Sequence, residues 1–372
     1  MNDFTTTVEN TAQTNAEKIA TQLGLMDTKH LMEMISRQGG YGGTETAFTE
    51  AISGFNMIHQ GVKLPMNREL QGHIFVTRPC LNLTDDNIAA VRELSSLYMR
   101  TGTGNWMGAL RAMLDPITAK QYPRHGTEMF DTRQAFLPFM SNLCVSATGW
   151  PDRVGNTYAY ERGLENETSI FHDTGYRILS QWECSMTLEN IVGNPVTKFA
   201  EMMLIYQGAV YLNRMMPHLE CLALNEIDYT MRIYRIILDP NGRTISGIAA
   251  TGSSMLSSSN IGSMFNYTRE SAYNEDSKQV TLQFDSVGAM YNDPYLMRAF
   301  NRTVSNGDFC PAMGSESTRH ELFVRIDPDQ RQLFNFKCFP WINEYTIELE
   351  WWVDKHIYDK LFYDDQVMRG EI

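Results

Sequence analysis

The sequence lacks the features that would place the chain in a membrane or on a secretory route. No apolar run approaches the roughly 18 residues that a membrane-spanning helix requires. The first residues, Met1 to Thr7, contain no basic segment followed by an apolar one, so no secretory signal is recognisable. We therefore expect a protein that is made and folded in a cytoplasm.

Positive charge is also scarce. The chain has 31 Lys and Arg against 44 Asp and Glu, a formal net charge of −13, and no four basic residues follow one another. Tight binding to phosphate groups requires concentrated positive charge, so the composition argues against stable binding to nucleic acid. An acidic surface would instead repel a polyanion that only passes along it.

Motifs for metals and disulfides are missing as well. The six cysteines are widely spaced, contain no C-x-x-C pair, and predict reduced, mostly buried thiols. They are Cys80, Cys144, Cys184, Cys221, Cys310 and Cys338. His172-Asp173, and His125 near Glu128, have no third ligand at the usual spacing, which predicts surface or turn residues rather than a metal site.

Three further motifs resemble known functional motifs but do not complete them. Residues Gly39–Gly43 lack the Lys-Ser/Thr of a P-loop and a preceding strand, so a hinge is favoured over a phosphate site. The stretch that begins at Gly252 lacks the second glycine of a nucleophile elbow. Glu348 and Glu350, beside Trp351, leave two interpretations open: paired carboxylates that hydrolyse a sugar, or the solvated face of an edge strand, which we favour. The sequence thus predicts no catalytic, cofactor-binding or metal-binding residue, no cofactor and no enzymatic activity.

What the sequence does contain is strong strand patterning between Asp228 and Asn292. Residues Asp228–Leu238 have the two-residue alternation of a strand. Asp239–Gly242 then provides the fixed φ of Pro and the positive φ of Asn-Gly that a tight reversal needs. The chain returns through Arg243–Thr251 and forms another strand at Gln279–Val287, which together predict an antiparallel sheet.

Other elements are expected on both sides of this sheet. Short strands are predicted at 72–77, 168–171, 176–186 and 345–353, and a second hairpin from 321–326 and 333–339 joined by a turn at 327–330. Helical faces begin at Ile88, with Thr84 as the cap, and at Pro195, with Asn194 as the cap; Pro217 ends the second one. Ser253–Ser263 has six serines and predicts a flexible loop that orders only on contact.

These elements predict an α+β fold that is mainly β: an antiparallel β-sandwich or barrel with one packed helix, helical insertions, and extensions at both ends. Three parts are expected along the chain. Residues 1–68 form a partly helical N-terminal arm, residues 69–292 a β domain with a helical insertion near 84–131, and residues 293–372 a C-terminal extension with a β-hairpin.

The order of elements resembles the tail-tube fold of contractile-tailed bacteriophages, and most closely the proteins that initiate the tube at the baseplate. The resemblance covers roughly residues 72–292. It rests on the element order and on two phrases, Asp-Tyr-Thr-Met-Arg-Ile-Tyr at 228–234 and Phe-Asp-Ser-Val-Gly-Ala-Met-Tyr at 284–291. The chain departs from the family pattern at 89–131 and after Asn292, so the ring it would occupy is left open.

The resemblance implies a structural virion protein of the phage tail that takes part in genome ejection. Its copies would form a hexameric ring, with sheets joined edge to edge around a lumen through which DNA passes without specific binding. Exposed sheet edges favour such pairing, and a ring closes head-to-tail contacts. Partners would be other tail tube, baseplate or sheath proteins, without membrane insertion. Residues 1–60, 153–167 and 253–263 would reach the next ring.

Two functions of other classes remain open. One is a tail-associated carbohydrate hydrolase that uses Glu348 and Glu350 with Trp351 and Trp352. The other is a glycan-binding module, which is supported by the 41 aromatic residues (6 Trp, 17 Tyr and 18 Phe).

Overall fold

The computed structural model describes residues 69–94, 106–121, 130–160, 164–165, 167–172, 175, 177–265, 267, 269 and 278–361. The chain divides into two compact units, Met1–Arg68 and Glu69–Ile372. The predicted N-terminal helices, the Gly39–Gly43 hinge, His125, Glu128 and Asp173 lie outside the described residues. The three-part division of the chain stays a prediction.

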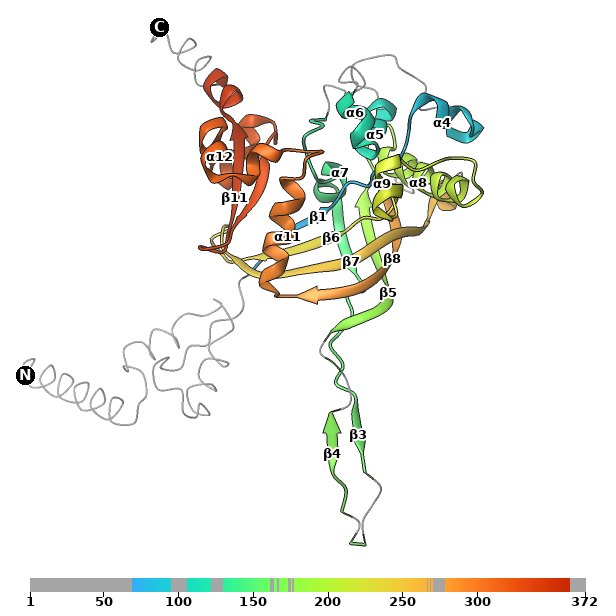
Figure 1. The fold of residues 1–372 in the computed structure, drawn as a ribbon, viewed down its shortest axis with the longest axis vertical. Coiled ribbons are helices and arrows are strands. Elements are labelled where there is room, and N and C mark those ends of the chain that lie inside the picture. The colour runs from blue at the N-terminus through green and yellow to red at the C-terminus, as the bar shows by residue number, and fades with distance from the viewer. Residues whose placement is uncertain are drawn as a thin grey trace, which may run out of the picture. The chain divides into compact units, whose positions relative to one another are not determined.

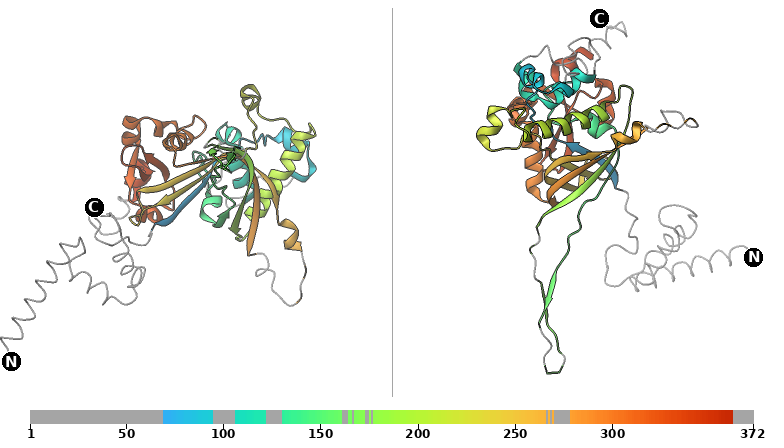
Figure 2. Two further views of the ribbon diagram at one scale, coloured as in Figure 1. Left: turned by 90° about the horizontal axis from the view of Figure 1, so that it is seen from below. Right: turned by 90° about the vertical axis from the view of Figure 1, so that its right-hand side faces the viewer.

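The larger unit is built on one six-stranded antiparallel sheet with the order β1-β6-β7-β8-β5-β2 (Figure 1). In chain order the strands are β1 (Leu70–Val76), β2 (Cys144–Thr148), β5 (Ile178–Glu189), β6 (Ile233–Leu238), β7 (Ile245–Ser259) and β8 (Gln279–Tyr291). The strands bend together into a strongly curved, nearly barrel-shaped sheet (Figure 2). The predicted α+β class is confirmed, and helices occupy about as much of the described chain as strands do.

The central reversal between β6 and β7 is formed as predicted. The Gly242 N–H donates to Asp239 O at 2.8 Å, the Asp239 N–H donates to Thr244 O at 2.9 Å, and Gly242 has a φ of 68°. Strand β6 begins only at Ile233, later than predicted, because Asp228 and its neighbours form a turn whose Thr230 N–H donates to Ile227 O at 3.3 Å.

The predicted loop at Ser253–Ser263 is wrong for its first seven residues, which belong to β7. Ser254 is buried, and its Oγ lies 2.8 Å from Ser286 Oγ and 2.9 Å from Thr251 Oγ1. These contacts, one to Ser286 on β8 and one to Thr251 on the same strand, satisfy the Ser254 hydroxyl inside the sheet, so a serine-rich run is compatible with a strand. A short 3₁₀ helix, η3 (Ile261–Phe265), follows.

Helix α8 (Pro195–Tyr211) is the predicted packed helix, and it covers one face of β5 and β8. Its Phe199, Met203 and Tyr206 are fully buried against the same core as Phe284 of β8. Asn194 precedes the helix as predicted, but its side chain does not cap it. The backbone there is left-handed, with a φ of 50°, and the Asn194 Oδ1 accepts from Asn190 Nδ2 at 3.0 Å instead.

The helical insertion is assembled from short pieces: α4 (Asp85–Ala89), α5 (Trp106–Leu114), α6 (Pro116–Gln121) and α7 (Pro138–Asn142), joined later by α9 (Leu219–Leu224). The predicted helix from Ile88 is shorter than expected. The N–H groups of Ala90 and Val91 donate three residues back, so the α-helix tightens into a 3₁₀ turn. Thr84 stands at the cap position, but its hydroxyl donates to Asn82 Oδ1 at 2.9 Å rather than accepting from the helix.

The C-terminal lobe contains α11 (Pro294–Val304), η4 (Pro311–Gly314), α12 (Glu316–Leu322), β9 (Phe323–Ile326), η5 (Pro328–Phe334), β10 (Phe339–Asn343), β11 (Glu348–Asp354) and a helix over residues 355–361. The predicted hairpin between 321–326 and 333–339 is wrong. A capping box between Asp327 and Gln330 starts η5, and positive φ angles at Asn335 and Phe336 turn the chain away. The hairpin of this lobe is β10–β11, and β9 pairs on the other side of β11.

Two cores pack against the curved sheet, and at the end of β1 and the start of β6 they take up alternate residues, Val76 and Ile233 in the first core and Phe75 and Tyr234 in the second. The first joins β5 and β8 to α5, α7 and α8. The second joins β1, β6 and β7 to α11 and the three-stranded sheet of the C-terminal lobe, around the stacked rings of Phe136 and Phe300 at 4.8 Å. In the described part of the chain, no helix is both long and apolar enough to cross a membrane.

A two-stranded arm projects from the sheet beyond β2 and β5 (Figures 1 and 2). It pairs β3 (Thr157–Ala159) with β4 (Ile170–His172), so the segment 153–167, which the resemblance nominates as a contact to the next ring, contains a strand. Its base is fixed by an aromatic group: Trp150 lies 5.3 Å from Trp182, and the Tyr291 hydroxyl donates to Pro151 O at 2.6 Å. Arg153 also lies over the Tyr291 ring, at 5.7 Å.

Candidate functional site

The two glutamates considered for sugar hydrolysis do lie together, but they are engaged within the fold. Both Glu348 and Glu350 form ion pairs with Arg325, at 2.9 and 3.0 Å. Glu350 is 5% exposed, and its oxygens also accept from Trp352 Nε1 and Asn343 Nδ2, both at 3.0 Å. The interpretation as a solvated edge is wrong, because β11 is the central strand of its sheet. A carboxylate with these partners is a structural group.

The histidines and cysteines do not converge on a metal. Among the residues that the structure describes, no group of three or more His, Cys, Asp or Glu could hold a metal ion. His172 is exposed on β4. All six cysteines are free thiols, and four of them are buried.

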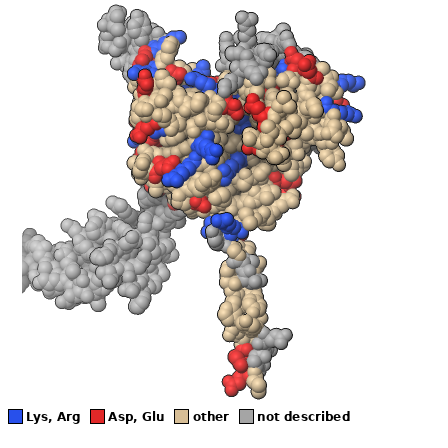
Figure 3. All heavy atoms as spheres, viewed as in Figure 1, with Lys and Arg blue, Asp and Glu red and all other residues tan. Residues whose placement is uncertain are grey.

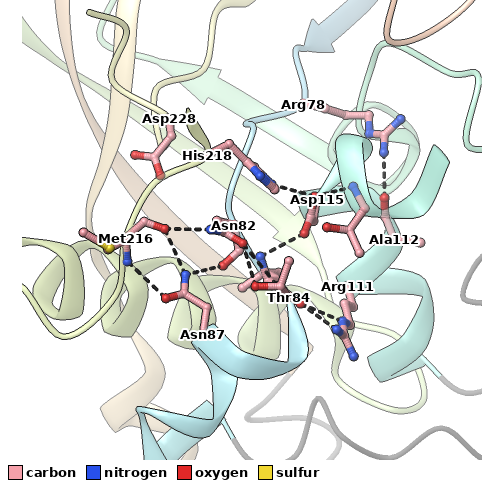
Figure 4. A network of polar contacts seen from close by, with 12 residues as sticks. Arg78, Asn82, Thr84, Asn87, Arg111, Ala112, Asp115, Met216, His218 and Asp228 are labelled. Atoms are coloured by element: carbon pink, nitrogen blue, oxygen red, sulfur yellow. Dashed lines mark hydrogen bonds and ion pairs between the residues drawn. The ribbon is translucent and has the colours of Figure 1, made fainter. Parts of the chain in front are cut away.

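A buried polar network connects the helical insertion to the sheet (Figure 4). The Asp115 carboxylate is 1% exposed, and it accepts from the Leu83 N–H at 2.9 Å, the Thr118 N–H at 2.9 Å and His218 Nε2 at 3.0 Å. Burial lowers the pKa of His218, but the hydrogen bond and charge of Asp115 outweigh burial and raise this pKa above its ordinary value. His218 therefore acts as a partner of Asp115 rather than as a free base.

The remaining charged groups of this network also hold backbone in place. Arg78 donates to four carbonyl oxygens, those of Ala112, Met113, Thr132 and Gln134, at 2.6–2.9 Å. The Tyr206 hydroxyl donates to Asp228, whose pKa is raised by burial. The network thus stabilises the junction of β1, α6 and the segment after α8.

A cavity of about 620 Å³ lies beside this network, with Tyr234 of β6 and Arg232, just before β6, among its lining residues. The Arg232 guanidinium donates to Thr251 O at 2.8 Å and lies 5.1 Å from the centre of the Tyr234 ring. Glu220, Glu226 and Asp308 add acidic side chains to the lining. The volume would suit a small ligand, but the charged groups deepest in the fold, Arg78 and Asp228, already have partners.

The sheet face opposite the two cores is the most distinctive surface of the described chain. The strand register brings together side chains that are mostly hydroxyls or amides, half-buried or exposed, here called the hydroxyl face; the apolar Met255 and Val287 and, on β6, Arg235 lie on the same side. Its members are Ser146, Thr148, Gln181, Ser185, Thr187, Ser253, Thr281 and Gln283. On β2, β5, β7 and β8 this face carries no Lys or Arg, and its charged residues are Glu183, Glu189 and Asp285.

Glu183 and Asp285 are directly opposite each other on β5 and β8. No basic side chain of the described residues forms an ion pair with either one. Like charges at directly opposed positions destabilise a sheet, so this pair opposes folding of the single chain. Its placement makes the hydroxyl face weakly acidic.

Both outer strands of the sheet leave an edge open. Within the described residues, β1 pairs only with β6, and β2 only with β5. One end of β1 is covered where the Leu137 N–H donates to Val76 O at 2.9 Å, and nearer its start the carbonyl oxygens of Gln71 and His73 accept from Arg235, so its edge lacks a strand partner but is partly engaged. Unpaired strand edges are templates for pairing with another chain. Within the described residues, the curved sheet thus has two outer strands that each lack a second strand partner.

Comparison with known proteins identifies the family of the chain. Residues 9–368 match the family described as "Putative phage tail tube protein". The chain belongs to this family of phage tail tube proteins, which confirms the resemblance found in the sequence at the level of the family. The family is a structural one, and membership implies a component of the virion tail. No curated protein matches the sequence.

Three solved structures are similar to 42% of this chain. One is the tube-terminating cap of the anti-feeding prophage, with 9% identity, 82% of that chain covered and a TM-score of 0.25. The second is the sheath/tube terminator of an extracellular contractile injection system, with 9% identity, 87% coverage and a TM-score of 0.25. The third, with 11% identity, 82% coverage and a TM-score of 0.24, comes from the sheath–tube complex of such a system.

The sequence predicted the family and open sheet edges, but it did not predict the hydroxyl face. The hydroxyl face depends on register between strands far apart in the chain, which a single sequence does not display. The arm did have a local signal. Tyr158 and Tyr160 alternate on one short stretch and Phe171 follows on another, with a Gly- and Asn-bearing segment between them, which is typical of a hairpin.

Proposed function

We propose that this chain is a structural subunit of a contractile phage tail that forms a hexameric ring of the tail tube, or of its tube-initiation end at the baseplate, around a lumen for DNA. The observation that carries the proposal is the division of the curved sheet into a sealed face, a hydroxyl face and two open edges. Partners of the ring are other tube, baseplate or sheath proteins.

The ring forms when the β2 edge of one copy pairs with the β1 edge of the next. These edges are different surfaces, so the contact is head-to-tail and closes only by completing a ring. The open edge of β2 includes Val145, which is 56% exposed. Pairing extends the sheet from copy to copy and places the hydroxyl faces on the inside.

The hydroxyl face suits a conduit for DNA. Neutral Ser, Thr and Gln side chains offer no ionic contact to phosphate, and the acidic pair Glu183 and Asp285 repels it. DNA therefore moves through the lumen without specific binding. The arm reaches along the tube toward the next ring.

The test is assembly of the purified full-length chain, followed by light scattering and negative-stain microscopy. Wild-type protein is expected to form rings or short stacks of rings. Val145→Lys places a charge on the β2 edge and is expected to leave monomers, because charged edge residues block strand pairing. Tyr345→Lys, at a position 97% exposed in the β10–β11 turn, is the matched control and retains rings. A wild-type chain that stays monomeric at high concentration refutes the proposal.

A further inference from the structure

The segment that links α8 to β6 carries a dense set of exposed apolar side chains, here called the apolar patch. Its members are Tyr211, Leu212, Met216, Leu219, Leu222, Leu224 and Ile227, which are between 49% and 86% exposed. Soluble proteins rarely leave so many neighbouring large apolar groups in water unless a partner covers them. The apolar patch is therefore an interaction surface, and its occupant has to be identified.

The arm is the second uncovered apolar surface of the described chain. Val154, Tyr158, Tyr160, Leu164, Ile170 and Phe171 are each at least 43% exposed. The rings of Tyr158, Tyr160 and Phe171 lie 5.2–6.1 Å apart and form one aromatic surface on the ribbon. A two-stranded ribbon is only marginally stable in water by itself, so the arm also needs a surface to cover it.

The charges next to these two surfaces are opposite in sign. The far end of the arm has exposed Glu165 and Glu167, whereas basic residues lie where the arm leaves the sheet (Figure 3). Arg214 is exposed within the apolar patch, and no acidic side chain in the described part of the chain forms an ion pair with it. The acidic residues of the same segment, Glu220 and Glu226, line the cavity together with Leu224 and Ile227 of the apolar patch, whereas Arg214 does not line it. A basic group inside an apolar surface matches an apolar ribbon with an acidic end.

The two surfaces also lie toward opposite ends of the six-stranded sheet. The arm continues beyond the ends of β2 and β5, whereas α8 and α9 lie toward the opposite end of the sheet (Figures 1 and 2). Contacts between two different surfaces at opposite ends of a subunit repeat from copy to copy and generate a stack.

We propose that the arm of one copy docks on the apolar patch of a second copy in the next ring, with Glu165 and Glu167 next to Arg214. The inference rests on the proposed function, since it assigns the surface on which the arm of a ring subunit lands. The contact is heterologous, arm to patch, and it holds rings in a stack rather than closing a ring.

Cross-linking between two single variants of the full chain tests the contact. Tyr160→Cys protein is mixed with Leu219→Cys protein and treated with a short bismaleimide, with wild-type protein as the background for native thiols. A dimer that requires both variants is expected. Val192→Cys is the matched control, because that position is 95% exposed but lies outside the apolar patch, and it should stay at background. A dimer formed by the Leu219→Cys variant alone shows a symmetric patch-to-patch contact and overturns the proposal.

Charge reversal supplies a second test that does not depend on thiols. Arg214→Glu is expected to leave single rings without stacks, and Glu165→Arg with Glu167→Arg in the same chain is expected to restore stacking. Both outcomes are counted by negative-stain microscopy. Stacks that persist in Arg214→Glu, together with background cross-linking, overturn the docking proposal while leaving the ring intact. Loss of rings from wild-type protein would instead refute the proposed function, so the two failures are distinguishable.

Discussion

The opposed pair Glu183 and Asp285 gives a quantitative test of the hydroxyl face. Side chains directly opposite each other on antiparallel strands have Cβ atoms about 4.5–5.5 Å apart. Two unit charges about 6 Å apart in water repel by about 0.7 kcal/mol, within the range of about 0.2–1 kcal/mol for cross-strand pairs. Since the pair has no cationic partner in the described residues, Glu183→Gln should raise the free energy of unfolding by about 0.5 kcal/mol.

The assay is urea unfolding of the full chain at low protein concentration, in low salt and in about 1 M NaCl, where the screening length falls to about 3 Å. Asp285→Asn should give a similar gain, and the double variant no more than either single one, because the repulsion is removed once. Glu189→Gln is the matched control, since Glu189 faces Gln279, and it should change little. The reasoning fails if Glu183→Gln does not stabilise the chain, or if its gain persists at high salt.

Four other outcomes follow from particular contacts. Gly252→Ala would bring a Cβ within 2.5 Å of Val287 O and should lower the free energy of unfolding by about 1–3 kcal/mol, whereas Gly208→Ala, with open space around its Cβ, should raise it by about 0.5–1 kcal/mol; urea titration separates them. The raised pKa of His218 means that its contact with Asp115 stabilises the fold most when the pH lies below the ordinary value of 6.5, and that this effect is lost as pH rises through the higher folded-state pKa. Wild-type stability should therefore fall more steeply than that of His218→Gln as the pH rises above 6.5. Tyr291→Phe removes the bond to Pro151 O and should cost about 0.5–1.5 kcal/mol, seen as faster hydrogen exchange at the base of the arm. Rings that carry both Glu183→Lys and Asp285→Lys should retain double-stranded DNA in a filter assay, with retention that falls as salt rises, while wild-type rings should not.

The sequence predicted the parts of this fold that local patterns determine. The reversal at Asp239–Gly242 and the helix after Asn194 depend on neighbouring residues, and both are formed where expected. The prediction of a loop at the serine-rich end of β7 was wrong. The Ser254 hydroxyl is satisfied by Thr251 and by Ser286, and Ser286 lies on another strand, β8. The hairpin between β9 and β10 failed for a similar reason, since β11, later in the chain, takes the place between them.

The same division between local and distant determinants explains why the hydroxyl face was not predicted. Glu183 and Asp285 are 102 positions apart in the numbering and meet only through the β5–β8 register. Such a surface exists only once the strands have paired, so its chemistry cannot be predicted from any single segment of the sequence.

The buried face of the sheet and the hydroxyl face also constrain each other. The even-numbered side chains of β8 from Val280 to Phe284 are buried beneath α8, so the alternate positions Thr281, Gln283 and Asp285 are obliged to face the other way. A one-residue shift in the β5–β8 register would expose Phe284 and bury Asp285 together. The hydrophobic core that determines the fold therefore also determines which side chains lie on the hydroxyl face. One strand register specifies both the fold and the chemistry of the surface that would line a lumen.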